Sequence, residues 1–576
     1  MLKKCFLIFK WWIVAYIVLG FFLQFCNTYG IMVFQKILDK VLVVNQLEEL
    51  MQLLILYGVL LGASTIISYV VEYPQVYLSN SILERLKVMA LGKVSKIDYR
   101  SYQNIGTGEM IKVIDNGASA GMNMIYSFYL RIFHELLPTI IFSLLFISFY
   151  NIKIMFVIAF GYLVIFVLTN ILLKFLYNIK SSLLVSQEKM SKYSIRGFME
   201  LVVFRVNKRY EKEINRLNMT ANDIVKKSAQ IRMIHESFFA IFALLVNIIK
   251  IIVLIVGVNN ILAGNASIGM IVALIMFIDK VYMPVAIFNV IYVDYKLNKV
   301  TYNRFEEFLN SPEDKNLESG EELKSFSGAV KFEDVTFSYG DTNFLNHISF
   351  SIDKGSSVAI VGLSGSGKST IVKLMLGLLK KSSGKILIDN HDIDNVKLNS
   401  FYDHISYISQ EAPIFDTSIR SNIIFDEKIP DDEIYEIMDK VHLKDKILSF
   451  PEKLDTLVGE KGMKLSGGER QRLAFGRIIA QRRNLIILDE PVSALDNITE
   501  KSIMDTILTL YKEKTVVIIA HRLGFVKNVD KILLVRDGMI VGEGNFDHLY
   551  NNNSYFQELW NKDSKNEDDS ELLSRV

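Results

Sequence analysis

The sequence predicts two domains of different class in one chain: an α-helical domain that crosses a membrane, followed by an α/β domain built around a phosphate-binding loop. Three observations support this prediction. The first half contains long stretches without a charged residue, the second half has an apolar strand that runs into a glycine-rich loop, and a later apolar strand ends in two carboxylates. With 576 residues, 51% of them hydrophobic, and a mean hydropathy of +0.28, the chain is too apolar for a purely soluble protein.

The apolar half is expected to form membrane-spanning helices, each of which needs about 20 mostly apolar residues. Stretches of about this length or longer carry no charge at Trp11–Gln35, Met51–Val71, Leu136–Ile152, Ile154–Leu173 and Ile251–Ile278. The last stretch contains a turn signal between Asn259 and Asn265 and therefore serves two spans. We expect six spans, at about residues 12–34, 51–73, 131–151, 154–176, 238–259 and 267–291.

The segments between the spans, at about 74–130 and 177–237, are charged but keep a helical periodicity, so they are expected to extend the membrane helices into the cytoplasm. Basic residues precede the first span and cluster between residues 189 and 216. An excess of Lys and Arg marks the cytoplasmic side, which predicts a multi-pass protein of the cytoplasmic (inner) membrane, in contact with its lipid and with both termini in the cytoplasm. The net charge, 64 − 62 = +2, implies no nucleic-acid partner.

The phosphate-binding loop fits the pattern G-x-x-x-x-G-K-[ST] and follows the apolar strand Val358–Val361. Glycines let backbone amides face the phosphates, while Lys368 is expected to reach the β- and γ-phosphates and Ser369 to offer a hydroxyl to Mg²⁺. A predicted helix over Ile371–Leu379 turns its positive N-terminal end toward the same anion. The ATP-binding residues predicted here are Gly362, Ser364, Gly365, Ser366, Gly367, Lys368, Ser369 and Thr370.

A second strand, Leu485–Leu488, is apolar throughout, as in a buried parallel sheet, and brings Asp489 and Glu490 to its carboxyl end. Asp489 is placed to hold Mg²⁺ through water. Glu490 is placed to orient or deprotonate an attacking water.

Between the loop and these acids lies the run Leu465-Ser466-Gly467-Gly468-Glu469, and the three motifs in this order resemble the ATP-hydrolysing half of ABC transporters. The resemblance implies that Ser466, Gly467 and Gly468 bind the γ-phosphate of ATP held by the opposite subunit. It further implies an adenine-stacking aromatic, a glutamine that senses Mg²⁺ and the membrane domain, a D-loop, and a switch histidine that acts with the catalytic acid. The matching residues are Tyr339, Gln410, Ser493–Asp496 and His521.

Other matches resemble the exporter type of this family. Gly459–Gly462 resembles the exporter X-loop, whose acidic residue, here Glu460, would contact a coupling helix. Coupling helices are expected at Gly106–Ile111, with Glu109, and at Phe204–Lys208, with Arg205. The family fold is then six transmembrane helices with long cytoplasmic extensions fused to an α/β P-loop ATPase domain with a helical subdomain. The expected boundaries are 1–310 for the membrane domain, 311–327 for a linker, 328–562 for the nucleotide-binding domain, and 563–576 for a polar, disordered tail.

The function implied by the resemblance is ATP-driven export of a drug, lipid or peptide by alternating access, with ATP and Mg²⁺ as cofactors. The expected partner is a second half-transporter chain, identical in a homodimer, although a heterodimer stays open. The substrate is not identified, because fold does not choose among cargoes. An importer of the siderophore type and a regulator that transports nothing are the alternatives.

Charged residues also occur inside the predicted fifth and sixth spans. Lys250 and Asp279 each lie 14 residues from the centre of the intervening turn (264 − 250 and 279 − 265), so both are about 20 Å along their helices from it. Ionisable residues inside a membrane are costly and usually face a partner or a wet cavity. We therefore expect Lys250 and Asp279 to pair with each other or to line a translocation cavity, with Lys280 as a competing partner and a purely structural pair as the alternative.

Overall fold

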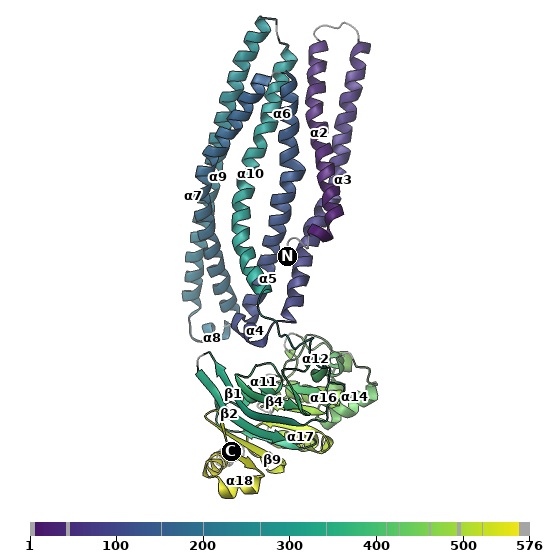
Figure 1. Cartoon of the computed structure of the whole chain (residues 1–576), viewed down its shortest axis with the longest axis vertical. Helices are drawn as coiled ribbons and strands as arrows, with labels where there is room; N and C mark the ends of the chain where they lie inside the picture. Colours follow the sequence, from purple (N-terminus) through teal and green to yellow (C-terminus); the bar gives the residue numbers. More distant parts are fainter. Residues whose placement is uncertain are drawn as a thin grey trace. The chain divides into compact units, whose positions relative to one another are not determined.

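The computed structural model describes residues 6–41, 47–150, 152–199, 201–264, 266–340, 342–410, 412–425, 427–459, 462–491, 497–520 and 522–563. These residues fall into two compact units (Figure 1). Unit 1 comprises Met1–Ser95 and Ile105–Ser311, and unit 2 comprises Lys96–Asn104 and Pro312–Val576.

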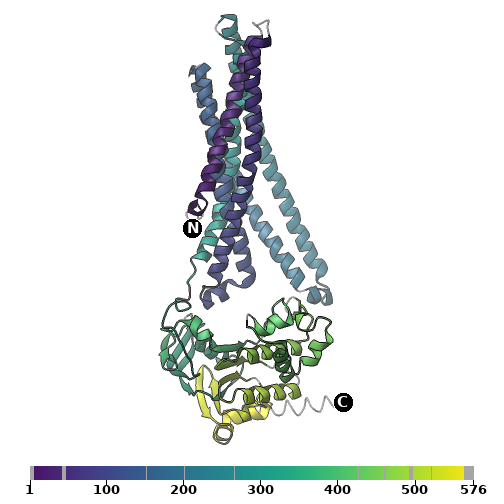
Figure 2. The same cartoon turned by 90° about the vertical axis from the view of Figure 1, so that its right-hand side faces the viewer.

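Unit 1 is built of long helices. In this unit α2 packs along α3, α7 packs along α9, and α10 contacts α2, α5, α6, α7 and α9 (Figure 1). Figure 2 shows the paired α7 and α9 diverging from α5 and α10 toward the short α8. The helices are α2 (Lys10–Val41), α3 (Leu47–Val94), α5 (Thr107–Met122), α6 (Leu137–Tyr150), α7 (Ile152–Met199), α8 (Leu201–Val206), α9 (Tyr210–Leu262) and α10 (Ile268–Leu309).

The predicted helical extensions are confirmed by the lengths of these helices. Helix α9 has 53 residues, which at about 1.5 Å per residue is more than twice the hydrocarbon thickness of about 30 Å. Among the described residues, 5 helical runs are long and apolar enough to cross a membrane, and they overlap five of the predicted spans, with differences of at most one residue beyond a run. The remaining span, 154–176, falls in α7, where the side chains of residues 162–176 lie outside the described part of the structure.

The third predicted span differs from a regular α-helix. Between α5 and α6 the backbone forms two π-helical stretches, η1 (Asn123–Leu130) and η2 (Ile132–Leu136). Such widened turns shift the direction in which following side chains point and are frequent at functional sites. Nothing in the hydrophobic pattern signals this change, because stretches of 8 and 5 residues are too short to show a period of their own.

The turn predicted between Asn259 and Asn265 corresponds to the connection between the end of α9 at Leu262 and the start of α10 at Ile268. Ser267 caps α10 by accepting a hydrogen bond from the Met270 amide at 3.1 Å. Asp39 of α2 accepts hydrogen bonds from the Gly269 amide at 2.9 Å and the Ser267 hydroxyl at 2.8 Å. A carboxylate at this end satisfies amides that the first helical turn leaves unpaired.

Unit 2 contains two sheets. The larger has the strand order β10-β9-β3-β8-β7-β6, in which β6, β7, β8, β3 and β9 are parallel and β10 is antiparallel to β9. The smaller is antiparallel, with the order β2-β1-β4-β5. Its strands are β1 (Val330–Tyr339), β2 (Thr342–Ile352), β4 (Ser383–Ile388) and β5 (His391–Asp392), and those of the larger sheet are β3 (Ser357–Val361), β6 (Ile405–Ile408), β7 (Leu485–Asp489), β8 (Thr515–Ile519), β9 (Lys531–Arg536) and β10 (Met539–Gly544).

Helices cover these sheets and complete two hydrophobic clusters, one on each side of the larger sheet's apolar strands. Every residue of β7 and β8 is buried, which explains why both strands, apart from Asp489 and Thr515 at their ends, are apolar rather than alternating. The helices are α4 (Tyr99–Ile105), α11 (Lys368–Met375), α12 (Leu398–Tyr402), α13 (Ile419–Ile424), α14 (Asp431–Lys440), α15 (Lys444–Ser449), η3 (Lys453–Asp455), α16 (Gly467–Gln481), α17 (Asn497–Leu510), η5 (Val526–Asn528), α18 (Phe546–Asn552) and helical residues 554–563.

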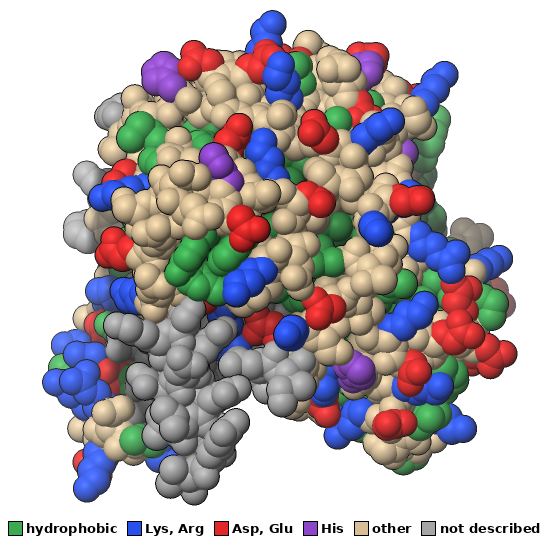
Figure 3. Space-filling view, turned by 90° about the horizontal axis from the view of Figure 1, so that it is seen from below, with side chains coloured by type: hydrophobic (Ala, Val, Ile, Leu, Met, Phe, Trp, Pro, Cys, Tyr) green, Lys and Arg blue, Asp and Glu red, His purple; other side chains and the backbone are tan. Residues whose placement is uncertain are grey.

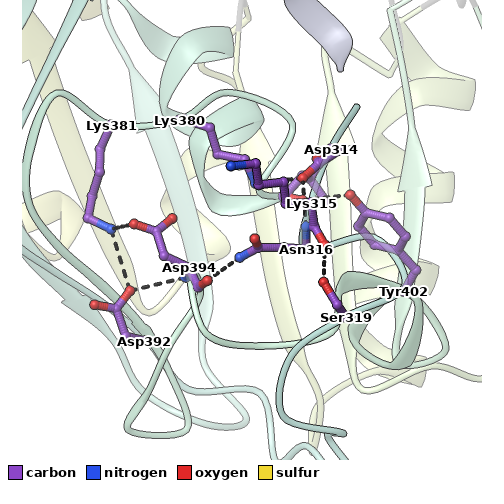
Figure 4. Close-up of polar contacts among 10 residues, drawn as sticks. Asp314, Lys315, Asn316, Ser319, Lys380, Lys381, Asp392, Asp394 and Tyr402 are labelled. Carbon is purple, nitrogen blue, oxygen red and sulfur yellow. Dashed lines mark hydrogen bonds and ion pairs between the residues drawn. The ribbon is translucent and has the colours of Figure 1, made fainter. Parts of the chain in front are cut away.

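The segment expected to be a linker packs against unit 2. Figure 4 shows Asp314 beside Lys380, whose atoms Oδ1 and Nζ are 3.0 Å apart, and Asn316 bonded to the Asp394 carbonyl. Leu323 and Phe326 are buried in the core of the smaller sheet. The segment is therefore irregular but anchored by hydrogen bonds, an ion pair and apolar contacts.

One face of the chain is drawn in space-filling form in Figure 3, where basic and acidic side chains are interspersed and hydrophobic side chains form small patches. This mixture agrees with the near-neutral net charge of the sequence.

Candidate functional site

The phosphate-binding loop connects β3 to α11 and owes its shape to two glycines. A Cβ atom on Gly362 would lie 2.2 Å from the carbonyl oxygen of Val535, so no side chain fits there. Gly367, which caps α11, has a φ of 112°, a left-handed conformation that strongly favours glycine. Ser364 and Gly365 are exposed at the loop, whereas Ser366 and Thr370 are buried beneath it.

Lys368 begins α11 and is 5% exposed. Its Nζ donates hydrogen bonds to the carbonyl oxygens of Gly362, at 2.8 Å, and Leu363, at 3.0 Å. Burial lowers the pKa of Lys368, while the nearby carboxylates of Glu490 and Asp489 oppose this shift. The ammonium is thus held under the loop where phosphate oxygens are expected.

The structure brings Ser369 and Asp489 together from different elements, with 3.3 Å between the serine Oγ and the aspartate Oδ1. Burial raises the pKa of Asp489, and the neighbouring charge of Glu490 raises it further. A hydroxyl and a carboxylate side by side are the hard oxygen ligands that Mg²⁺ prefers, so this pair fits a magnesium ion. Tyr407 also interacts with the Asp489 carboxylate, a contact that the sequence patterns did not predict.

Glu490 directly follows β7 and has a φ of 49°. A non-glycine residue in this conformation costs free energy, and such positions cluster at functional sites. Its Oε2 accepts a hydrogen bond of 2.7 Å from the Nε2 of Gln410. The two residues, 80 positions apart, therefore lie beside the magnesium pair at the carboxyl edge of the sheet.

Ser466 caps α16 in a reciprocal capping box. Its hydroxyl accepts from the Glu469 amide at 3.2 Å, and the Glu469 carboxylate accepts from the Ser466 amide at 2.7 Å. Burial opposes ionisation of Glu469, but these hydrogen bonds and the charge of Lys446 outweigh it and hold its pKa below the usual range. Gly467 and Gly468 form the first turn, whose free amides and positive dipole suit an anion.

The other predicted residues of this unit are less fully described. Tyr339, at the end of β1, is 39% exposed and contacts Phe337 and Phe344 edge-on. His521, Glu460 and Ser493–Asp496 of the D-loop motif lie outside the described residues.

A segment of the first interspan region joins unit 2. Residues 96–104, which include most of α4, belong to that unit, where Tyr99 packs against its core and Lys373 Nζ lies 5.7 Å from the Tyr99 ring centre. Glu109, the predicted coupling residue, lies instead in the first turn of α5 in unit 1. Arg205 lies in the last turn of α8 and is exposed.

Unit 1 contains a cavity of about 910 Å³. Lys250, Asp279 and Lys280 all line it, and Lys250 Nζ lies 2.6 Å from Asp279 Oδ1. The pairing of Lys250 with Asp279 and the lining of a translocation cavity by these residues are carried forward as proposals. The remaining lining residues are Gln24, Asn27, Ile31, Glu135, Leu136, Thr139, Phe239, Phe242, Ala243, Val246, Asn247, Met276, Tyr282, Met283, Pro284, Ala286 and Ile287.

Glu135 is a cavity residue that none of the sequence motifs indicates. It lies in the π-helical η2 and accepts a hydrogen bond of 2.9 Å from Arg131 Nε. A carboxylate within a predicted span was the available signal, because such residues usually mark a cavity or a partner.

Two family models match the chain. Residues 13–285 match the model described as ABC transporter transmembrane region, and residues 345–493 match the model described as ABC transporter. The chain is 37% identical to ATP-binding cassette sub-family B member 6 of Rattus norvegicus over 49% of its own length and 34% of that protein. It is 34% identical to the mitochondrial iron-sulfur clusters transporter ATM1 of Candida albicans, over 55% and 46% of the two chains.

The chain therefore spans about a third to a half of the length of these curated relatives. A putative multidrug export ATP-binding/permease protein, YgaD of Bacillus subtilis, is 26% identical over 86% of both chains. Among solved structures, a bacterial Atm1-family ABC exporter with ATP bound has a TM-score of 0.85 at 21% identity, covering 96% of this chain and 99% of that one. This likeness shows the fold: a helical membrane domain fused to a C-terminal nucleotide-binding domain.

The two family models match in order along residues 13–493, and the apolar helices of unit 1 make this a multi-pass membrane protein. The chain belongs to the ABC transporter family, with one membrane domain and one ATP-binding domain.

Proposed function

We propose that the chain is one half of an ATP-driven exporter of the cytoplasmic membrane, which hydrolyses ATP in unit 2 to move a substrate through unit 1. The observation that carries this proposal is the meeting of Ser369 with Asp489, and of Gln410 with Glu490, at one edge of the sheet. These pairs bring a phosphate loop, a magnesium-type ligand pair and a candidate base into one site.

Each residue has a physical role in this proposal. Lys368 and the loop amides hold the β- and γ-phosphates, and the Tyr339 ring stacks on adenine. Ser369 and Asp489, with Gln410, hold Mg²⁺, which supplies charge stabilisation to the transferred phosphoryl group. Glu490 orients the attacking water and accepts its proton, while Gln410 donates a hydrogen bond that fixes the carboxylate.

The proposed assembly is a dimer of half-transporters, with an identical chain as the favoured partner. In it Ser466, Gly467 and Gly468 face the γ-phosphate held by the other chain, and each site is incomplete alone. Glu109, Arg205, Glu460 and His521 keep their proposed roles in coupling and switching. Closure of the two ATP sites then converts the membrane domains to a conformation whose cavity opens to the outside. Hydrolysis of ATP returns them to the starting conformation.

The test uses the full chain in proteoliposomes, with Mg²⁺ATP supplied outside to the outward-oriented ATP-binding domains. Fluorescent amphiphiles of anionic, neutral and cationic charge serve as probes, because the cargo is not identified. We expect ATP-dependent accumulation of at least one probe in the lumen. ATP-driven loss of a preloaded probe would mean import, and hydrolysis that moves none of the probes would favour a regulator.

A further inference from the structure

The cavity of unit 1 combines charged groups in unequal number. Lys250, Asp279, Lys280 and Glu135 line it, and Arg131 is bonded to Glu135. The set has three cations and two carboxylates, which leaves one positive charge. Asp279 and Glu135 each hold a close partner, Lys250 at 2.6 Å and Arg131 at 2.9 Å.

Lys280 is the cation that these pairs leave over. Lys280 is half-buried. The carboxylate of Glu135, which already bonds Arg131, interacts with the Lys280 ammonium electrostatically. Among the residues that the structure describes, its ammonium has no hydrogen bond or close ion pair. A half-buried ammonium without a close counter-charge inside a membrane-spanning unit is costly, so it favours an anion that enters the cavity.

The rest of the lining is mainly apolar, with Phe239, Phe242, Val246, Met276, Met283 and Ile287 among its members. Its volume of about 910 Å³ falls near the upper end of the range of about 300–1,000 Å³ for small-molecule sites. Gln24, Asn27, Thr139 and Asn247 add uncharged polar groups. An occupant that matches this lining has an extended apolar body and one charged head.

We propose that this cavity binds an amphiphilic anion, a molecule with one carboxylate or phosphate group on an apolar body, and that Lys280 is the residue that recognises its charge. The inference rests on the proposed function, because it names the class of cargo at the site where cargo would be carried. Lys250 and Asp279 neutralise each other and do not compete with the cargo for Lys280.

Equilibrium binding to the full chain in lipid nanodiscs tests the proposal, with empty nanodiscs to subtract partition into lipid. The probes are a fluorescent medium-chain alkyl carboxylate and the matched alcohol and trimethylammonium compounds. We expect the carboxylate to bind about tenfold tighter than either analogue, as one desolvated charge-assisted contact allows. Equal affinity for the three head groups would overturn the proposal.

The variants separate charge from shape. Lys280→Gln is expected to weaken carboxylate binding about tenfold, Lys280→Arg to keep it within about threefold, and Lys280→Glu to favour the trimethylammonium probe. Lys299→Gln, an exposed lysine of the same helix outside the cavity lining, is the matched control and should change nothing. If Lys280→Gln and Lys299→Gln bind the carboxylate equally well, Lys280 does not recognise it.

The anion has two sources, a solute or the head group of a membrane lipid. ATP-dependent accumulation of the carboxylate in the lumen would identify a solute, and ATP-dependent movement of a labelled phosphatidic acid between leaflets would identify a lipid. Either result with loss in Lys280→Gln supports the proposal. ATP-driven transport of the trimethylammonium probe alone would overturn the proposal of an anion site and leave the proposal of export intact. Charge-selective binding without transport of any probe would overturn the proposal of export and leave the proposal of an anion site intact.

Discussion

The ATP site of unit 2 and the cavity of unit 1 place buried charge in opposite ways. Lys368 lies beneath a loop whose carbonyls accept its hydrogen bonds, with Asp489 and Glu490 near enough to offset its burial. Lys280 lies in a cavity where both carboxylates have closer partners. The first arrangement combines backbone amides and a helix end around the position proposed for phosphate, and the second offers one side-chain charge on an apolar wall.

The difference lies in what each site must discriminate. Phosphate recognition by backbone groups depends on loop shape, so glycines such as Gly362 and Gly367 carry it. A cavity between helices is lined by side chains that can change without altering the fold, and its selectivity depends on a few charges. We therefore expect substitutions of the phosphate-loop and carboxylate residues of unit 2 to abolish hydrolysis, and substitutions in the cavity to change which molecules stimulate it.

The largest expected effect is that of Glu490→Gln. The amide keeps an acceptor for Gln410 but cannot take the proton of water, so we expect ATP binding to persist and hydrolysis to fall by about 10²–10⁴-fold. ATPase assays and equilibrium nucleotide binding measure the two effects. Glu513→Gln, an exposed glutamate of the same unit, should leave both unchanged. A fall of less than about tenfold would remove Glu490 from the catalytic role.

Much of unit 2 could be predicted because its site is encoded in short, ordered motifs. The loop at 362–369 and the acids after Leu485–Leu488 can each be recognised from a few consecutive residues. A buried parallel sheet then brings the carboxyl ends of their strands to one edge. The role of Tyr407 could not be predicted, because its contact with Asp489 depends on the pairing of β6 with β7. No local sequence pattern indicates that pairing.

Unit 1 could be predicted in its spans and not in its details. Apolar length identifies the helices, but the π-helical turns that present Glu135 have no distinct signature. The placement of residues 96–104 with unit 2 depends on tertiary contacts of Tyr99, and a short charged helix reads like any exposed segment. Lys250 and Asp279 were found because charge is rare in a membrane span and their distances from the turn agree.

A second large effect is expected at Ser466, where two roles can be separated. Ser466→Asp keeps a good helix cap but places a negative charge where the γ-phosphate of the partner's ATP is proposed to lie. We expect the midpoint of thermal unfolding to stay unchanged and the rate of ATP hydrolysis to fall about 10²-fold or more. Ser466→Ala should lose about 1 kcal/mol of stability with a milder loss of activity. Asn545→Asp, at the cap of α18, is the matched control.

The same variant tests action between chains. A mixed dimer of a Lys368→Ala chain and a Ser466→Asp chain places both lesions in one site and leaves the other whole. We expect up to about half of the wild-type ATPase activity, if the two sites operate independently, and far less in either mutant homodimer. Activity of the mixed dimer no higher than that of the homodimers would contradict action in trans or independent operation of the sites.

A smaller effect is expected when the cavity ion pair is broken. Lys250→Gln or Asp279→Asn alone leaves the other charge without its partner, whereas the double variant removes both. We expect a coupling of about 0.5–1 kcal/mol in thermal unfolding, near the mean for polar contacts between membrane helices. Transport should fall in the single variants and recover in the double variant if the pair is structural. Arg232 and Glu236, an exposed pair on α9, provide the control cycle.

The smallest effect is expected where the segment after α10 is anchored to unit 2. Lys380→Gln breaks the ion pair with Asp314, but the lysine side chain is 46% exposed and Asp314 keeps a hydrogen bond from the Asn316 amide. We expect a loss of about 0.2–1 kcal/mol, typical of surface pairs, and no change in ATPase activity. Unfolding of the full chain followed beside Lys512→Gln, an exposed lysine, measures this. A loss larger than that of Ser466→Ala would mean that the anchor supports the domain as strongly as a helix cap does. The region predicted as a linker would then be a structural part of unit 2, held by this charge as well as by the buried Leu323 and Phe326.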